Sequence, residues 1–201
     1  MKPSTIGALA CALALPLVLG ACISVFPKSN PVQLYRFGDA PAGAAAGAAG
    51  GTMVLKGATV FPVAVAGDRI LTVTGAETAY IAGARWVAPA SILLDDALGK
   101  AFDAPGSPRL VERGEPLGAP STLRLEVRAF EARYPGPNAV VAVRATLIRN
   151  ADRTIVAEKA FEASMPAADN RQGAIVASFD GAVRKVIGDI RDWTAANAPA
   201  R

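Results

Sequence analysis

The sequence contains no histidine, and its two cysteines, Cys11 and Cys22, both lie near the amino terminus. Without histidine, neither a Ser-His-Asp nor a Cys-His nucleophilic site can form, and the usual zinc-ligand sets are excluded as well. No disulfide is expected, because Cys11 lies in a segment that we predict to be removed and Cys22 at a position that we predict to be modified. Carboxylate or lysine chemistry is all that this composition leaves open to catalysis.

The acidic residues do not form a typical catalytic pair. Asp95 and Asp96 are adjacent in a predicted helix, where neighbouring side chains point about 100° apart and cannot share one proton site. Asp189 and Asp192 lie three residues apart on a second predicted helix and can share a face, but basic residues flank them. We therefore expect charge-paired, solvated helix faces and a protein that is not an enzyme, with no cofactor and no metal site.

Neither sign of charge dominates the chain. It has 21 Lys+Arg against 17 Asp+Glu, a net charge of +4, and loss of Lys2 with a cleaved leader would lower this to +3. Such a mild excess, without a clustered basic stripe, argues against nucleic-acid binding. The roughly 180 residues that would then remain are enough for one domain with a sizeable core.

The sequence begins with a secretory leader. Lys2 precedes an uncharged run from Ile6 to Leu19, which is shorter than the roughly 20 residues that a helix needs to span a bilayer. The run ends in Leu19-Gly20-Ala21-Cys22, which resembles the lipobox of bacterial lipoproteins. That motif directs diacylglycerol to the cysteine thiol before cleavage, and the new amino group then receives an N-acyl chain. We expect a signal peptide at 1–21 and lipid attachment at Cys22.

The alternative for Cys22 is an ordinary secretory cleavage site that happens to lie beside a cysteine. If the cysteine is acylated, its chains anchor the mature protein stably in a membrane. Ile23 follows Cys22, in place of the aspartate that usually signals inner-membrane retention, so we predict an outer-membrane anchor with the domain facing the periplasm. Residues 22–31 are polar and broken by proline, which predicts a flexible tether, and residues 32–201 are predicted to form the domain.

An Ala- and Gly-rich segment at 41–52 interrupts the early part of that domain. It lacks the Gly-Lys-Ser/Thr ending of a phosphate-binding loop, and it has few large apolar groups that packing could fix. We predict a long flexible loop.

Hydrophobic patterns in the rest of the chain predict an α+β domain with a largely antiparallel or mixed sheet and two amphipathic helices. Strands are expected at 32–38, 53–65, 70–74 and 78–87, followed by a three-stranded antiparallel meander between Leu123 and Ala163. Helices are expected at 89–102 and 172–196, the second with a capping box formed by Asp169 and Gln172.

Three details of this pattern are specific. The alternation changes parity at Ala129-Phe130, which predicts a β-bulge. The segment Pro135-Gly136-Pro137-Asn138 predicts a hairpin turn. Pro62 suggests an edge strand or a bulge within 53–65.

Arginines recur along the meander, and they have two readings. They could form a basic face for lipid headgroups or an acidic partner, or they could pair across strands with Glu126 and Glu131 on a solvated face, which the alternation favours. The residues are Arg124, Arg128, Arg133, Arg144 and Arg149.

The order of several landmarks resembles the ABC-type transport auxiliary lipoprotein family, which includes the PqiC-like lipoproteins of MCE lipid-transport systems. The landmarks are Cys22, Tyr35-Arg36-Phe37-Gly38, Arg85-Trp86 directly before a helix, Phe130 in its strand, and Trp193 in the closing helix. Each is weak alone, and their order along the chain carries the resemblance.

The resemblance implies an α+β domain that acts as an accessory or docking component. Members of the family are periplasm-facing lipoproteins that work with an MCE protein and its ABC permease and ATPase to move phospholipids or other lipophiles between membranes. Some members form homo-oligomeric rings. It also makes Arg85 and Trp86 candidate partner contacts, although Val87-Ala88-Pro89-Ala90 replaces the more acidic helix start of the family, and core packing is the alternative for Trp86 and Trp193.

A different class of function stays open. Small α+β lipoproteins also activate cell-wall synthases or assist the assembly of outer-membrane complexes, so a structural or regulatory role is the alternative.

Overall fold

The computed structural model describes residues 31–39, 52–112, 114 and 118–199. Cys22, almost all of the predicted tether and almost all of the predicted 41–52 loop lie outside the described residues. The described elements are β1 (Gln33–Tyr35), β2 (Met53–Val60), α1 (Val63–Ala66), β3 (Arg69–Thr74), β4 (Glu77–Trp86), α2 (Ala90–Phe102), β5 (Arg109–Val111), β6 (Ser121–Tyr134), β7 (Asn138–Arg149), β8 (Ile155–Pro166) and α3 (Gln172–Asn197).

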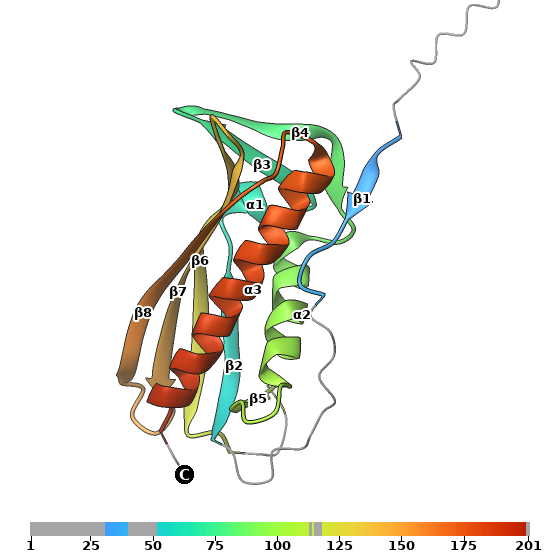
Figure 1. Ribbon diagram of the computed structural model, residues 1–201. Coiled ribbons are helices and arrows are strands. Elements are labelled where there is room, and N and C mark those ends of the chain that lie inside the picture. Colours follow the sequence, from blue (N-terminus) through green and yellow to red (C-terminus); the bar gives the residue numbers. More distant parts are fainter. Residues whose placement is uncertain (1–30, 40–51, 113, 115–117, 200–201) are drawn as a thin grey trace, which may run out of the picture. The chain divides into compact units, whose positions relative to one another are not determined.

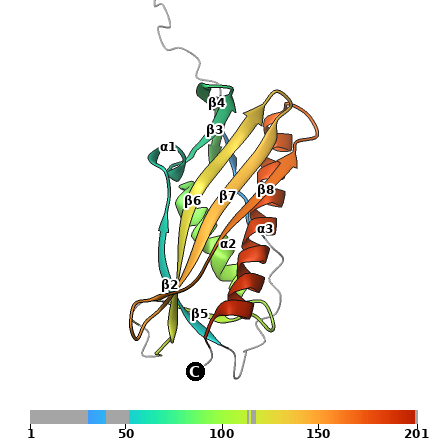
Figure 2. The same cartoon turned by 90° about the vertical axis from the view of Figure 1, so that its left-hand side faces the viewer.

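The eight strands belong to one mixed sheet, and the two long helices cover one of its faces. Figure 1 shows α2 and α3 side by side along this face, and Figure 2 looks onto the opposite face, with β6, β7 and β8 in front and the helices behind. We call these the inner and the outer face. The predicted α+β class is confirmed, with the one-turn helix α1 in addition.

The long strand β6 organises the sheet. One edge pairs antiparallel with β7, and β7 pairs antiparallel with β8, which confirms the predicted meander. The other edge pairs in parallel with β2 near the start of β6 and with β3 near its end. β4 pairs antiparallel with β3 and parallel with β1, while β5 pairs parallel with β2. One strand of 14 residues thus joins both halves of the sheet.

The predicted bulge lies in β6. Val127 pairs with Val143 and Ala129 pairs with Ala142, so Arg128 is an extra residue. Because the insertion shifts the alternation by one position, apolar side chains face inward on both sides of it. The predicted hairpin turn is also confirmed, since β6 ends at Tyr134 and β7 begins at Asn138.

The predicted strand 53–65 was too long, because β2 ends at Val60. Pro62 has no N–H for a strand ladder, and instead its carbonyl accepts hydrogen bonds from the N–H groups of Val65 and Ala66 at 3.0 and 3.1 Å, which begins α1. The irregularity in β2 comes earlier, between Lys56 and Thr59. Pro62 therefore starts a helical turn and marks neither an edge strand nor a bulge.

The predicted capping box is wrong. The N-cap residue of α3 is Arg171, not Asp169, and its side chain makes no capping hydrogen bond. The Asp169 carboxylate accepts a hydrogen bond from the backbone N–H of Arg171 at 2.8 Å. The Gln172 side-chain amide instead donates to the Ala82 carbonyl at 2.8 Å, and its oxygen accepts from the Tyr35 hydroxyl at 3.3 Å. Gln172 thus fastens the start of α3 to β1 and β4.

Aromatic rings fill the centre of the core. Trp86 packs edge-on against Phe37 and Phe179, with centroid distances of 4.9 and 5.4 Å. Phe130 stacks tilted against the same two phenylalanines at 5.2 and 5.1 Å. All four side chains are at most 3% exposed, so β4, β6, α3 and the segment that follows β1 meet at one point.

Candidate functional site

The predicted lipid attachment site, Cys22, lies outside the described residues. Within the described part of the chain, no helix combines the length and the apolar character needed to cross a membrane. The anchor and the tether therefore stay predictions.

The predicted contact pair Arg85-Trp86 divides between surface and core. Trp86 is 2% exposed and belongs to the aromatic core, which was the alternative for this residue. Arg85 is exposed, and its guanidinium lies 2.8 Å from the Asp68 carboxylate. The hydrogen bond from Arg85 holds the pKa of Asp68 below its ordinary value of 3.8. Only Arg85 has a side chain that a partner could reach.

The first candidate acid pair is engaged in local ion pairs. Asp95 accepts a hydrogen bond from the Thr59 hydroxyl at 2.8 Å and lies 3.5 Å from the Lys56 ammonium. Partial burial lowers the pKa of Lys56, but its hydrogen bonds and charge interactions with Glu112 and Asp95 raise it above the ordinary value overall. Asp96 pairs with Lys100 at 3.7 Å. Through Lys56, this arrangement links α2 to β2 and to Glu112, which directly follows β5.

The second candidate acid pair, on α3, is similar. Asp189 lies 2.9 Å from the Lys185 ammonium, and Asp192 lies 2.8 Å from the Arg191 guanidinium. No group of three or more potential metal ligands occurs among the residues that the structure describes. The charge-pairing interpretation of these aspartates agrees with their positions.

Four of the five strand arginines form ion pairs, although mostly not across strands. Arg128 pairs with Glu126 at 2.8 Å and Arg133 with Glu131 at 2.8 Å, each along its own strand. The others are Arg144, which reaches across to Glu158 on β8 at 3.3 Å, and Arg149, which reaches Asp152 in the following turn at 3.1 Å. The predicted solvated ion pairs exist, but the prediction that Glu126 and Glu131 pair across strands is wrong. Each pairs with the arginine two residues further along its own strand, because such residues share a face.

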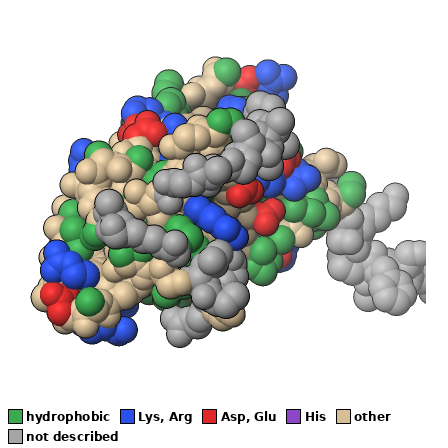
Figure 3. Space-filling view, turned by 90° about the horizontal axis from the view of Figure 1, so that it is seen from below, with side chains coloured by type: hydrophobic (Ala, Val, Ile, Leu, Met, Phe, Trp, Pro, Cys, Tyr) green, Lys and Arg blue, Asp and Glu red, His purple; other side chains and the backbone are tan. Residues whose placement is uncertain are grey.

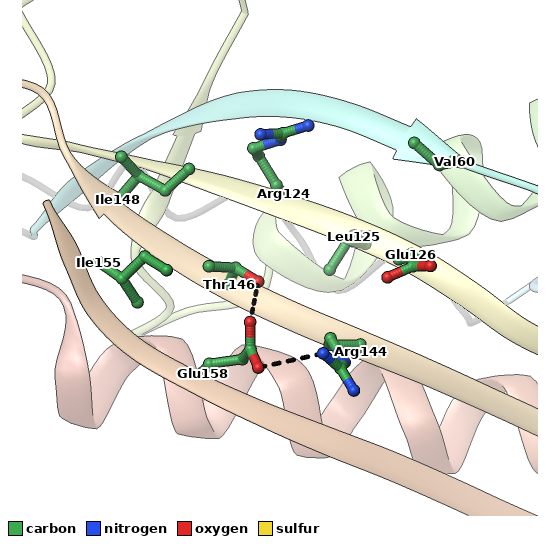
Figure 4. A pocket seen from close by; sticks show the side chains of 9 residues that line it. All are labelled: Val60, Arg124, Leu125, Glu126, Arg144, Thr146, Ile148, Ile155 and Glu158. Carbon is green, nitrogen blue, oxygen red and sulfur yellow. Dashed lines mark hydrogen bonds and ion pairs between the residues drawn. The ribbon is translucent and has the colours of Figure 1, made fainter. Parts of the chain in front are cut away.

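A groove crosses the outer face near the turn between β7 and β8. Its part next to β8 has a volume of about 400 Å³ and includes Arg124, Arg144, Thr146, Ile155 and Glu158 (Figure 4). Glu158 lies between its two partners, accepting hydrogen bonds from Arg144 at 3.3 Å and from Thr146 at 3.2 Å. Arg124 extends from β6 toward β2, away from this network.

The groove continues toward β2 and the turn. This second part, of about 460 Å³, shares Arg124 and Ile148 with the first and adds Gly57, Thr122 and Arg153, among others. We call the two parts together the outer groove. The sequence pattern singled out Arg124 but missed Arg153, which lies in the turn between β7 and β8. The available signal was the spacing of Arg149 and Asp152, which lets these two residues pair and leaves Arg153 without a partner in the described part of the chain.

A second groove, of about 390 Å³, lies between α2 and α3. Small and aliphatic residues line it, and three cations surround it: Lys100, Arg184 and Arg191. Each of these cations has a carboxylate within 3.3 Å, namely Asp39, Asp180 and Asp192 in that order. On the face seen in Figure 3, basic and acidic side chains are likewise interspersed. This groove therefore differs from the outer one, because its cations are already neutralised.

Comparison with known proteins identifies the family. The family model described as "ABC-type transport auxiliary lipoprotein component" matches residues 35–191. The chain belongs to this family. The match confirms the resemblance, and it runs from the first residue of the Tyr35-Arg36-Phe37-Gly38 landmark to within two residues of Trp193.

Solved structures agree with this assignment. Protein XCC0632 from Xanthomonas campestris, assigned to the family DUF330, is 25% identical, with a TM-score of 0.67 over 82% of this chain and 92% of that one. The crystal structure of an uncharacterized protein, 16% identical, gives a TM-score of 0.62 over 82% of this chain and 99% of its own, which shows the shared fold. No curated protein matches the chain.

Proposed function

We propose that this protein is the outer-membrane-anchored docking component of an ABC transport system, held by a lipidated Cys22 and binding the MCE protein of that system from the periplasmic side. The observation that carries the proposal is the family match over residues 35–191. The family is one of auxiliary transport components, and the transport of phospholipids or other lipophiles is the finer part of the proposal.

The structure is consistent with a binding role. Both candidate acid pairs are engaged in ion pairs with neighbouring cations. The sheet offers an outer face without a covering α2 or α3 (Figure 2). In this proposal the domain provides binding surfaces for partner proteins, and the permease and ATPase drive the transport.

The anchor is tested by fractionation. Cys22→Ala should give a folded protein that no longer sediments with membranes and no longer incorporates labelled palmitate, while Cys11→Ala, which changes the other cysteine, should behave like the wild type. Membrane-bound Cys22→Ala protein would contradict the anchor. Ile23→Asp should move the protein from the outer-membrane to the inner-membrane fraction of a density gradient if the outer membrane is its destination.

The partnership is tested by co-purification of the full-length, detergent-solubilised protein. We expect an MCE protein and its permease and ATPase to copurify, and deletion of the gene to weaken the outer-membrane barrier. Recovery of a cell-wall synthase or a barrel protein instead would favour the structural or regulatory alternative. The homo-oligomeric ring is tested on the same preparation, by light scattering of the solubilised complex.

A further inference from the structure

Two cations stand apart from the others on this molecule. These cations are Arg124 and Arg153, whose side chains have no ion pair, hydrogen bond or aromatic contact with any residue that the structure describes. In the described parts of the chain, every other lysine and arginine side chain has an ion pair, a hydrogen bond, an aromatic contact or another electrostatic interaction. Both side chains are exposed, and both line the same part of the outer groove.

The local structure holds these two arginines apart from the available acids. Asp152 is occupied by Arg149 and by the Thr154 hydroxyl, which donates to it at 2.7 Å. Glu158 is occupied by Arg144 and Thr146. Glu126, the other carboxylate that lines the groove, pairs with Arg128 at 2.8 Å. These carboxylates are therefore already paired, and the positive charges of Arg124 and Arg153 stay without a counter-ion among the described residues.

The fold also leaves room beside Arg124. A Cβ added to Gly57 on β2 would lie 2.8 Å from the Cγ of Arg124 and 2.6 Å from the Leu123 carbonyl oxygen. Glycine at this position therefore lets the stem of Arg124 lie close against β2. Near it, the Thr122 hydroxyl donates to the Asn150 side-chain oxygen at 2.6 Å, which joins β6 to the turn that carries Arg153.

Apolar side chains lie next to the unpaired charges. Ile155 is 63% exposed and Val60 is 50% exposed, and both line the groove, with Ile148 between its two parts. Exposed aliphatic side chains gain stability when a partner covers them, and unpaired guanidinium groups form strong bidentate bonds with carboxylates. The two features together match a ligand that is both acidic and aliphatic.

A peptide segment fits this combination better than a lipid tail does. The Arg144–Glu158 ion pair and the Thr146 hydroxyl interrupt the apolar lining, so an acyl chain would desolvate polar groups without satisfying them. A peptide segment of a partner instead presents charged and aliphatic side chains every few ångströms along its length. This interval is comparable to the spacing of the strands in the groove, so such a segment can match both the charged and the apolar lining residues. Positive charge left over in the groove selects for carboxylates on that segment.

We propose that the outer groove binds an acidic segment of a partner protein, with carboxylates bound to Arg124 and Arg153 and aliphatic side chains covering Ile155 and Val60. This deepens the proposed function and rests on it for the presence of a protein partner. It assigns the contact to the outer face of the sheet and leaves Arg85, at the end of β4, outside it.

The test uses the full-length, membrane-anchored protein carrying a photo-crosslinking amino acid at Ile155, with Glu162 on the same strand as the control position. We expect a crosslink at position 155 to a transporter component, within a segment that contains at least two acidic residues. The double variant Arg124→Glu/Arg153→Glu should reduce that crosslink at least about tenfold. The control Lys185→Glu on α3, which pairs with Asp189 and lies outside the groove, should leave it unchanged. Exchanging the acidic residues of the segment for lysine should restore binding to the double variant.

Each other outcome has a defined meaning. If the wild type copurifies with transporter components but the charge reversal changes neither the crosslink nor the yield, this inference is wrong and the proposed function stands. If position 155 captures an acidic segment of a protein unrelated to transport, in the same arginine-dependent way, the groove assignment stands and the proposed function is wrong. If the Cys22→Ala protein instead binds vesicles of anionic phospholipid, but not neutral ones, through Arg124 and Arg153, a headgroup is the ligand and the inference is overturned.

Discussion

The two faces of the sheet differ in their side chains: the inner face is aromatic and buried, and the outer face is charged and exposed. On the inner face, Phe37, Trp86, Phe130 and Phe179 are at most 3% exposed and touch one another. On the outer face, charged residues alternate along the strands and most of them pair locally. Among the family landmarks of the sequence, the aromatic residues Phe37, Trp86 and Phe130 belong to the inner face.

This difference explains what the family resemblance can report. The aromatic landmarks build the core of this chain, so they report on the fold and, with it, on the family. A partner-binding surface needs exposed side chains, and the outer groove contains none of the landmarks. Recognition of the family and location of its binding surface are therefore separate problems in this molecule.

The largest expected effect tests whether the inner face is the source of stability. Phe130→Ala removes a ring that contacts Phe37, Phe61, Trp86 and Phe179, so we expect the free energy of unfolding to fall by about 3–5 kcal/mol. The control, Ile155→Ala on the outer face, should change it by less than about 0.5 kcal/mol. Urea denaturation of the Cys22→Ala protein measures both. Similar losses in the two variants would contradict the contrast between the faces.

The sequence predicted the elements whose physical signal is local and periodic. The parity change at Ala129-Phe130 located the bulge, the Pro-Gly-Pro-Asn segment located the hairpin, and the apolar stripe of 172–196 gave α3 to within one residue. Each of these signals is carried by consecutive residues. The α+β class followed from adding them together.

Features that depend on distant partners could not be predicted in this way. Asp169 and Gln172 have the spacing of a capping box, yet Gln172 bonds to Tyr35 and Ala82, residues far away in the sequence. The parallel pairings of β6 with β2 and β3 also join remote segments. The outer groove depends on which carboxylates are already occupied, and pairing of that kind is set by the folded structure.

A second prediction concerns the point where the segment after β1 approaches both helices. Gly38 has a φ of 78°, its N–H donates to Asp180 at 2.9 Å, and an added Cβ would lie 2.5 Å from the Cβ of Ala97. Gly38→Ala should cost roughly 3 kcal/mol of unfolding free energy, from backbone strain and overpacking together. The control Gly75→Ala, also at positive φ but with no atom within 4 Å, should cost only about 1 kcal/mol.

The strain and contact contributions at Gly38 can be separated. Combining Gly38→Ala with Ala97→Gly removes the close contact and keeps the positive φ, so the pair should recover part of the lost stability beyond the sum of the single changes. Thermal unfolding of the four proteins of this cycle measures the interaction. Strict additivity would mean that Ala97 plays no part.

A third prediction shows where the outer face does depend on packing. Gly57→Ala should lower the free energy of unfolding by about 1–3 kcal/mol, because its Cβ would press on the Leu123 carbonyl oxygen at 2.6 Å and on Arg124. Gly67→Ala is the matched control, since nothing lies within 4 Å of its added Cβ and its φ is −86°. Chemical denaturation compares the two. If Gly57→Ala were as stable as the control, the approach of β2 to Arg124 would be looser than described.

The smallest expected effect concerns the turn that carries Arg153. Hydrogen bonds from the Thr154 hydroxyl and backbone N–H, with a further contribution from Arg149, lower the pKa of Asp152 from 3.8 to about 2. Because the folded value lies below the unfolded one, the charged form stabilises the turn above about pH 4, and this contribution is lost as the pH falls from 3.8 toward 2. Thr154→Val removes the strongest donor and should move the pKa of Asp152 back toward 3.8, which carboxyl NMR titration measures directly. A pKa that stayed at about 2 in this variant would show that the backbone N–H of residue 154 and Arg149 hold the carboxylate without the Thr154 hydroxyl.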